Sequence, residues 1–176
     1  MTIYCSNKLE LFLRQTSPEN HSQLPSSLGD WNGHLFTIDR RKCLLLVNNK
    51  TCYAVLIANI LKKDVKDFVQ VFKERLIRQL DYDIKINEAQ EIRFRNELGG
   101  LVISKTNNDR RIMGIINHYI ENLKYPNYQG GIENWDEVRV SHILNDFPVR
   151  ADINDGKGRH GKYSSPTTLM RTLINN

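Results

Sequence analysis

The segment from residue 35 to residue 57, LFTIDRRKCLLLVNNKTCYAVLI, has the pattern of three consecutive antiparallel strands. Its run 43–47, CLLLV, is apolar throughout, which is typical of a strand buried on both faces of a sheet. A charged corner at 39–42 precedes this run. The turn at 48–51 follows it and begins with two asparagines, which can adopt the left-handed dihedrals of a tight hairpin. We predict a β-meander with strands at residues 35–38, 43–47 and 52–57.

The rest of the chain must cover this sheet. Short strands are predicted at 2–5 and 101–104, and the clearest amphipathic helix at 58–82. Further helices are predicted at 7–14, 87–96, 109–123, 135–144 and 167–174. Asn134 is a candidate cap for the helix at 135–144. Residues 16–33 are rich in Ser, Pro, Gly, Asn and His and read as a long surface loop.

These elements favour an α+β fold, in which a mainly antiparallel β-meander sheet of four or five strands is covered by α-helices. We expect residues 1–150 to form a single domain. Residues 151–176 then form a basic, glycine-rich tail that can end in a short helix. A chain of 176 residues is long enough to bury a substantial core.

Composition narrows the class of protein. No apolar run approaches the ~20 residues of a membrane span, and the N-terminus lacks the basic and apolar parts of a signal peptide. We expect a cytoplasmic protein that does not bind membranes.

Cys5, Cys43 and Cys52 lack metal-ligand spacing and are expected to be reduced core residues, so neither a metal nor a cofactor is predicted. The net charge of +5 favours an acidic partner such as nucleic acid, a nucleotide or an acidic protein.

The junction between the strand at 101–104 and the helix at 109–123 is the first candidate site. Its polar residues are Thr106, Asn107, Asn108 and Asp109, and its cations are Lys105, Arg110 and Arg111. Two arginines in a first helical turn oppose the helix dipole, so an anion bound at the free N–H groups would explain them. We expect the cations to bind phosphate, with Asn107 and Asn108 adding hydrogen bonds. The alternative is that Asp109 caps the helix while both arginines reach solvent or carboxylates.

The charged corner Asp39-Arg40-Arg41-Lys42 is the second candidate phosphate site. In a strand-like geometry, Arg40 and Arg41 point to opposite faces of the sheet. One of them is then free for an acidic ligand while the other pairs with a carboxylate. Three successive cations favour phosphate contact, and a solvated turn is the alternative.

Histidine supplies the weak candidates for catalysis. His34 precedes the charged corner, and His118 lies two turns into the helix that the junction opens. Either could act as a general base beside cations that stabilise developing charge. The segment 152–163, DINDGKGRHGKY, could also wrap a phosphate backbone, or be a disordered basic tail. The common hydrolase, zinc-protease and dinucleotide motifs are absent from the sequence.

Three motifs together resemble a known family. The first is M-x-I-Y-C-x-x-K-L, formed by Met1, Ile3, Tyr4, Cys5, Lys8 and Leu9; the second covers residues 28–43 and 47–51; the third is K-T-N-N-x-R-x-x-x-G-x-x-N at 105–117. Over roughly residues 1–118 the chain resembles the bacterial, archaeal and phage family called domain of unknown function 6933. The resemblance implies no particular activity, although small proteins of this distribution are often toxins, antitoxins, defence or counter-defence proteins.

The sequence therefore favours a small cytosolic protein of the phage–host conflict or toxin–antitoxin type. It would bind a phosphate-bearing ligand through the cations named above, and RNA or DNA is the ligand that we expect first. If it is an enzyme, a metal-independent nuclease is the expected class. Two alternatives stay open: an inhibitor or antitoxin that docks on an acidic protein surface, and a nucleotide-binding sensor. Sequence alone does not decide the oligomeric state.

Overall fold

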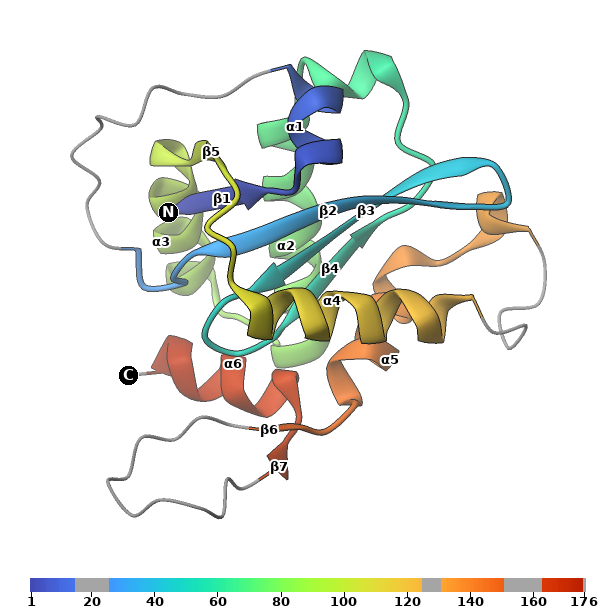
Figure 1. Ribbon diagram of the computed structural model, residues 1–176. Coiled ribbons are helices and arrows are strands. Elements are labelled where there is room, and N and C mark those ends of the chain that lie inside the picture. The colour runs from blue at the N-terminus through green and yellow to red at the C-terminus, as the bar shows by residue number, and fades with distance from the viewer. Residues whose placement is uncertain (15–25, 125–130, 151–162, 176) are drawn as a thin grey trace.

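The computed structural model describes residues 1–14, 26–124, 131–150 and 163–175. In this part of the chain a five-stranded sheet lies between two layers of helices (Figure 1). The predicted α+β class is confirmed, with a mixed sheet instead of a purely antiparallel one. Among the helices of these described residues, none has the length and apolar character needed to cross a membrane.

The order of strands across the sheet is β4-β3-β2-β1-β5. The strands are β1 (Thr2–Cys5), β2 (Trp31–Ile38), β3 (Arg41–Asn48), β4 (Ala54–Ile57) and β5 (Val102–Lys105). The predicted meander is present, because β3 pairs antiparallel with both β2 and β4. The short strand β1 runs parallel to both of its neighbours, β2 and β5. A separate two-stranded ladder joins β6 (Val149–Arg150) to β7 (Tyr163–Ser164).

Helices cover both faces of the sheet. The α-helices are α1 (Asn7–Leu13), α2 (Phe68–Ile84), α3 (Glu88–Glu97), α4 (Arg110–Leu123), α5 (Glu137–Asp146) and α6 (Pro166–Asn175). Short 3₁₀ helices are η1 (Lys62–Val65), η2 (Leu98–Gly100) and η3 (Ile132–Asn134). One hydrophobic core contains side chains of α1, α2, α3 and α6, and the other contains side chains of α4 and α5. The predicted final helix is thus packed into the first core through Met170 and Ile174.

The apolar run of β3 explains why the sheet needs two helical layers. All five side chains from 43 to 47 are 0% exposed. Because successive side chains of a strand point to opposite faces, Leu44 and Leu46 enter the first core, whereas Cys43, Leu45 and Val47 enter the second. The prediction of an interior strand is confirmed.

The two turns of the meander differ from the prediction. At the β2–β3 turn, Asp39 and Arg40 both have positive φ, 48° and 62°, as in a two-residue type I′ hairpin. At the β3–β4 turn the left-handed residue is Cys52, with φ 59°, and neither asparagine adopts that conformation. Asn48 instead organises this turn with its side chain, whose oxygen accepts the N–H groups of Lys50 and Thr51 at 3.0 Å.

Several predicted boundaries were wrong for local reasons. β2 begins at Trp31, four residues earlier than predicted, because this ring is completely buried against Phe72 with centroids 5.4 Å apart. The helix predicted at 58–82 begins only at Phe68, since Asn59 has a left-handed φ of 51° and breaks it. Asp136, instead of Asn134, caps α5.

The outer edge of β4 is covered by side chains of α5. Glu137 Oε1, Ser141 Oγ and Asn145 Oδ1 accept the backbone N–H groups of Ala58, Leu56 and Ala54, at 2.8, 3.0 and 2.7 Å respectively. Four residues of helix rise about 6.0 Å, close to the roughly 6.6 Å between alternate strand residues. The helix therefore satisfies successive edge groups as a neighbouring strand would.

Candidate functional site

The parallel strands β1 and β5 end side by side, and the helices that follow them diverge. The register pairs Cys5 with Lys105 at the carboxyl ends of the two strands. The helix that follows β1 is α1, which packs in the first core, whereas α4 follows β5 and packs in the second. Figure 1 shows α1 and α4 on opposite sides of the sheet. Such a switch point opens a crevice at the carboxyl ends of the strands, where α/β proteins commonly bind ligands.

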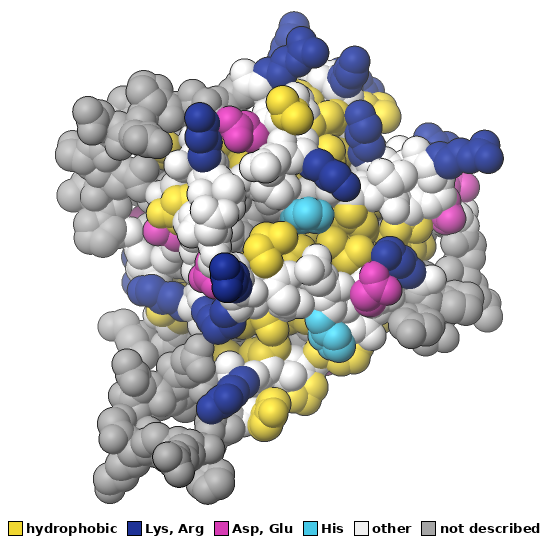
Figure 2. Space-filling view, viewed as in Figure 1, with side chains coloured by type: hydrophobic (Ala, Val, Ile, Leu, Met, Phe, Trp, Pro, Cys, Tyr) yellow, Lys and Arg dark blue, Asp and Glu magenta, His cyan; other side chains and the backbone are white. Residues whose placement is uncertain are grey.

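A crevice of about 590 Å³ lies at this switch point. Its lining residues come from three segments: Ser6, Asn7 and Lys8 after β1, His34 on β2, and Thr106, Asn108, Arg110 and Met113 after β5. These described residues include two cations and no carboxylate. On the surface of the molecule that is turned to the viewer, Figure 2 shows Lys and Arg side chains around a histidine. The crevice therefore combines positive charge with hydroxyl, amide and imidazole groups, and an anionic ligand fits this set.

His34 and Ser6 place two polar atoms without partners in the walls of the crevice. His34 Nδ1 and Ser6 Oγ are both enclosed, and neither has a hydrogen-bond partner among the described residues. Burial, and then the charge of Lys8, lower the pKa of His34 from its ordinary value of 6.5. The imidazole is therefore neutral at pH 7, with one donor and one acceptor nitrogen.

The start of α4 is capped by its own chain. Asp109 Oδ1 accepts the N–H of Ile112 at 3.0 Å, and Asn107 Oδ1 accepts the N–H of Asp109 at 3.1 Å. Asp109 thus caps the helix, as the alternative stated above expected, and its carboxylate accepts one of the N–H groups that we expected an anion to bind. Asn108, with φ 55°, turns the chain and lines the crevice.

The adjacent residues Arg110 and Arg111 have different surroundings. Arg110 is exposed and lines the crevice. Arg111 donates to the carbonyl of Asn49 and to Cys52 Sγ, the latter at 3.5 Å, so its guanidinium holds α4 against the β3–β4 turn. Lys105 is exposed and is not among the residues that line the crevice. Of the three cations predicted at this junction, the structure brings only Arg110 into the crevice.

The charged corner lies beyond the crevice, at the tip of the β2–β3 hairpin. The strand-like geometry predicted for Arg40 is wrong, because this residue is left-handed within the turn. Arg41 and Lys42 instead begin β3 and alternate between its faces. Lys42 Nζ lies 4.6 Å from the ring centroid of Phe12. Phe12 is one helical turn after Lys8 on α1, so Lys42 lies on the side of the hairpin that α1 covers.

The other candidates are not part of the crevice. His118 is exposed on α4, where Asn122 Nδ2 lies 3.3 Å from its Nε2, and it does not line the crevice. The residues of the basic glycine-rich segment, 152–162, lie outside the described part of the chain. Within that described part, no group of three or more His, Cys, Asp or Glu side chains is arranged to hold a metal ion.

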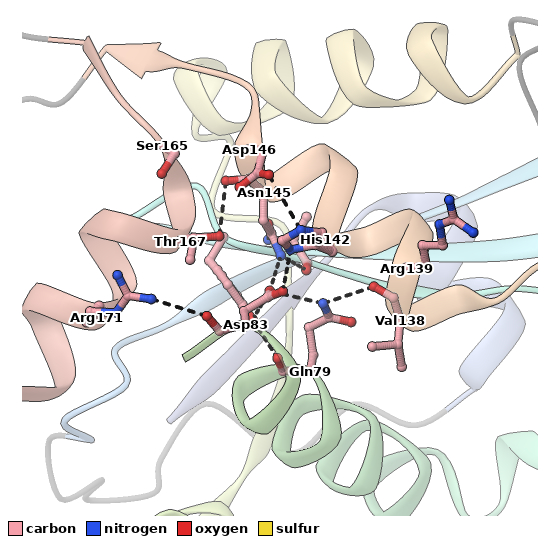
Figure 3. A network of polar contacts seen from close by, with 12 residues as sticks. Gln79, Asp83, Val138, Arg139, His142, Asn145, Asp146, Ser165, Thr167 and Arg171 are labelled. Carbon is pink, nitrogen blue, oxygen red and sulfur yellow. Dashed lines mark hydrogen bonds and ion pairs between the residues drawn. The ribbon is translucent and has the colours of Figure 1, made fainter. Parts of the chain in front are cut away.

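A second polar cluster surrounds Asp83 near the end of α2 (Figure 3). The side chain of Asp83 is 0% exposed. Its Oδ2 accepts hydrogen bonds from Tyr53 Oη, Gln79 Nε2 and Asn145 Nδ2 at 2.5, 3.0 and 3.2 Å. Its Oδ1 lies 2.7 Å from His142 Nδ1. Burial, and then the Asp83 charge, raise the pKa of Tyr53 well above 10, so the phenol stays protonated and donates.

His142 is the half-exposed end of this cluster. Its side chain is 36% exposed, and Nε2 lies 3.5 Å from Asp146 Oδ2. The ring meets Tyr82 edge-on, with centroids 5.3 Å apart. Asp83 fixes the orientation of the imidazole through Nδ1, as in an Asp–His pair. The same carboxylate joins α2 and α5 to the strand that follows Tyr53, so the cluster serves the packing of the domain.

A further recess, of about 450 Å³, lies beside the start of α5. Arg75, Arg78 and Trp135 line it together with Glu137. Arg75 Nη1 is 2.6 Å from Glu137 Oε2, and the other carboxylate oxygen accepts the N–H of Ala58. Burial raises the pKa of Glu137, and the charge of Arg75 opposes that rise. These charged groups stabilise the edge of β4, so the crevice at the switch point is the better ligand site.

Sequence reasoning did not single out Lys8, Ser6, Asp83 or His142 as site residues. A short strand followed at once by Ser6 and a helix was visible in the sequence. Its importance depends on the parallel pairing of β1 with β5, one hundred residues away. The polar face of α5 was also visible, as Glu137, Ser141 and Asn145 recur every four residues.

Comparisons with known proteins give a family and no activity. Neither a search of the curated proteins nor a search of the solved structures found a match. One family model matches residues 2–168, which extends the resemblance beyond the first two-thirds of the chain. The chain belongs to the family described as Domain of unknown function (DUF6933).

Proposed function

We propose that the protein binds a phosphate-bearing ligand, single-stranded nucleic acid, with one phosphate in the switch-point crevice. The observation that carries this proposal is the pair of cations, Lys8 and Arg110, at the diverging ends of two parallel strands. Lys8 and Arg110 supply positive charge, and Thr106 and Asn108 supply hydrogen-bonding groups that suit phosphate oxygens. The lack of a carboxylate among the lining residues keeps the local potential positive.

The hairpin tip favours a nucleic acid over a single nucleotide. From His34 to Ile38, the last residue before the turn, β2 extends about 13 Å at roughly 3.3 Å per residue. Arg40 and Arg41 are exposed at its end, and Lys42 lies between the tip and α1. A chain that carries several phosphates can contact both the crevice and the tip. A free nucleotide is the second candidate, because the crevice volume of about 590 Å³ is typical of a small-molecule site.

The experiment is fluorescence anisotropy with a labelled single-stranded RNA and DNA across a salt series. Lys8→Gln/Arg110→Gln should weaken binding and reduce the salt slope by about two, one for each lost phosphate contact. The control Lys63→Gln/Lys66→Gln removes the same charge from η1 and the residue that follows it, where both side chains are exposed. Equal losses in the two double variants, or no binding by the wild type at low salt, would contradict the proposal.

The same samples test for catalysis when their products are run on a gel. Cleavage without added metal would make the protein a nuclease, with His34 as the general base in the crevice. A role in phage–host conflict or as part of a toxin–antitoxin pair is supported only by the distribution of the resembling family, and it is part of this proposal.

A further inference from the structure

The crevice contains two kinds of polar group that need different partners. Lys8 and Arg110 are donors that match phosphate oxygens. The hydroxyl of Ser6 both donates and accepts, and a neutral His34 offers one donor and one acceptor. A phosphate accepts only, so it cannot satisfy the acceptor nitrogen of an imidazole. A hydroxyl group of the ligand can satisfy either nitrogen as well as the serine oxygen.

Ser6 is available for such a contact because its side chain does not cap the helix that follows it. It occupies the N-cap of α1 with φ −60° and ψ 156°, where serine normally accepts a hydrogen bond from the first turn. Here its side chain makes no capping bond, and Oγ has no partner in the described part of the chain. A buried hydroxyl without a partner lowers the stability of the fold. A ligand that bonds to the Ser6 hydroxyl would account for its place beside the crevice.

His34 gives the second, independent observation. It lies on β2 at the point where β1 ends, because the last parallel pair joins Cys5 to Gly33, the residue before His34. Its Nδ1 is enclosed without a partner, and Ser6 and His34 line the same crevice as the two cations. Burial and Lys8 keep the imidazole neutral at pH 7, so it is suited to a hydroxyl.

We propose that the crevice recognises ribose, with the 2′-hydroxyl against Ser6 and His34 and the adjacent phosphate against Lys8 and Arg110. This inference rests on the function proposed above and adds that the protein distinguishes RNA from DNA. A ribonucleotide presents a hydroxyl and a phosphate on neighbouring carbons. The 2′-hydroxyl is the group by which proteins tell the two nucleic acids apart at a given site.

The test compares three labelled oligonucleotides of one sequence: RNA, DNA with uracil in place of thymine, and RNA with 2′-fluoro sugars. The fluoro sugar keeps the RNA-like pucker and lacks the hydroxyl, so it separates hydroxyl recognition from shape. At one fixed salt concentration, we expect RNA to bind about tenfold more tightly than the other two, the effect of one or two good hydrogen bonds. A gel run afterwards checks that each oligonucleotide is intact.

Ser6→Ala and His34→Gln then assign the selectivity. Each variant should reduce RNA affinity toward DNA affinity and leave DNA affinity unchanged. Asn122→Ala is the control, since this partly exposed residue on α4 is not among those that line the crevice. Equal binding of RNA and 2′-fluoro RNA by the wild type would overturn this inference without any variant and would leave the phosphate site intact. Absence of binding to all three would overturn the proposed function itself.

Discussion

The Asp83 cluster and the switch-point crevice contain similar side chains but differ in how these are satisfied. The side chain of Asp83 is fully buried, and its two oxygens contact Tyr53, Gln79, Asn145 and His142. The crevice is open, and two of its polar atoms have no partner among the described residues. A histidine takes part in each.

This difference separates polar groups that stabilise the fold from those left for a ligand. A satisfied network in a low-dielectric interior is rigid, and removal of one member leaves several groups unpaired. Polar groups that the fold leaves without partners do not stabilise it, and they remain available to a ligand. The four predictions below test this separation, from the largest expected effect to the smallest.

Asp83→Ala should give the largest loss of stability. It removes the buried carboxylate that Tyr53, Gln79 and Asn145 share, and among the described residues each of these donors keeps only a backbone carbonyl as acceptor. We expect the free energy of unfolding to fall by about 3–5 kcal/mol, as when one partner of a buried polar pair is removed. Urea unfolding measures it, and Asp81→Ala on the exposed side of the same helix should change it by less than about 0.5 kcal/mol. Similar losses in the two variants would mean that the cluster is not structural.

Ser141→Ala should destabilise the protein by less, because one strand group loses its partner. The N–H of Leu56 is donated to Ser141 Oγ at 3.0 Å in a fully buried position. We expect a loss of about 1–3 kcal/mol, the cost of a buried unpaired donor. Ser6→Ala is the matched comparison, because it removes a buried serine hydroxyl that bonds to nothing described. It should leave stability unchanged or raise it, and a loss as large as that of Ser141→Ala would contradict the comparison.

Arg110→Gln and Arg111→Gln should have opposite effects although the residues are adjacent. Arg111→Gln breaks the contact with the β3–β4 turn and should lower stability by about 1 kcal/mol. The folded protein should bind nucleic acid almost as the wild type does. Arg110→Gln should keep the stability within about 0.5 kcal/mol and weaken binding. Thermal melts and anisotropy on both variants measure this, and loss of binding in both would mean that net charge alone governs affinity.

The sequence predicted the elements better than the site. The run from Cys43 to Val47 identifies an interior strand because only a doubly covered strand is apolar at every position. The period of the helix at 109–123 likewise follows from burial on one side. Both signals are local. The boundary at Trp31 was missed because the burial of one aromatic ring against α2 decides it.

The site depends on a pairing that no local pattern contains. Thr2 pairs with Val102, and this alignment alone brings Lys8 and Arg110 to one crevice. Sequence reasoning found Arg110 and could not separate it from Arg111. Successive residues of a helix are rotated by about 100° around its axis. This rotation directs Arg110 to the crevice and Arg111 to the β3–β4 turn. The choice depends on which face of α4 packs on the sheet.

His34 should give the smallest effect, a dependence of stability on pH. Because burial and Lys8 lower the pKa of His34 in the folded state below its unfolded value near 6.5, the unfolded chain binds more protons between the two values. The stability that His34 contributes is therefore fully present above pH 6.5, and it is lost as the pH falls through 6.5 toward the pKa of the folded state. His34→Gln should remove that part of the slope in urea unfolding at pH 7.5 and 5.5, whereas His118→Gln, at an exposed position, should retain it. If the slope survives in His34→Gln, the imidazole does not need to be neutral in the fold, and its role as a partner for a hydroxyl loses its support.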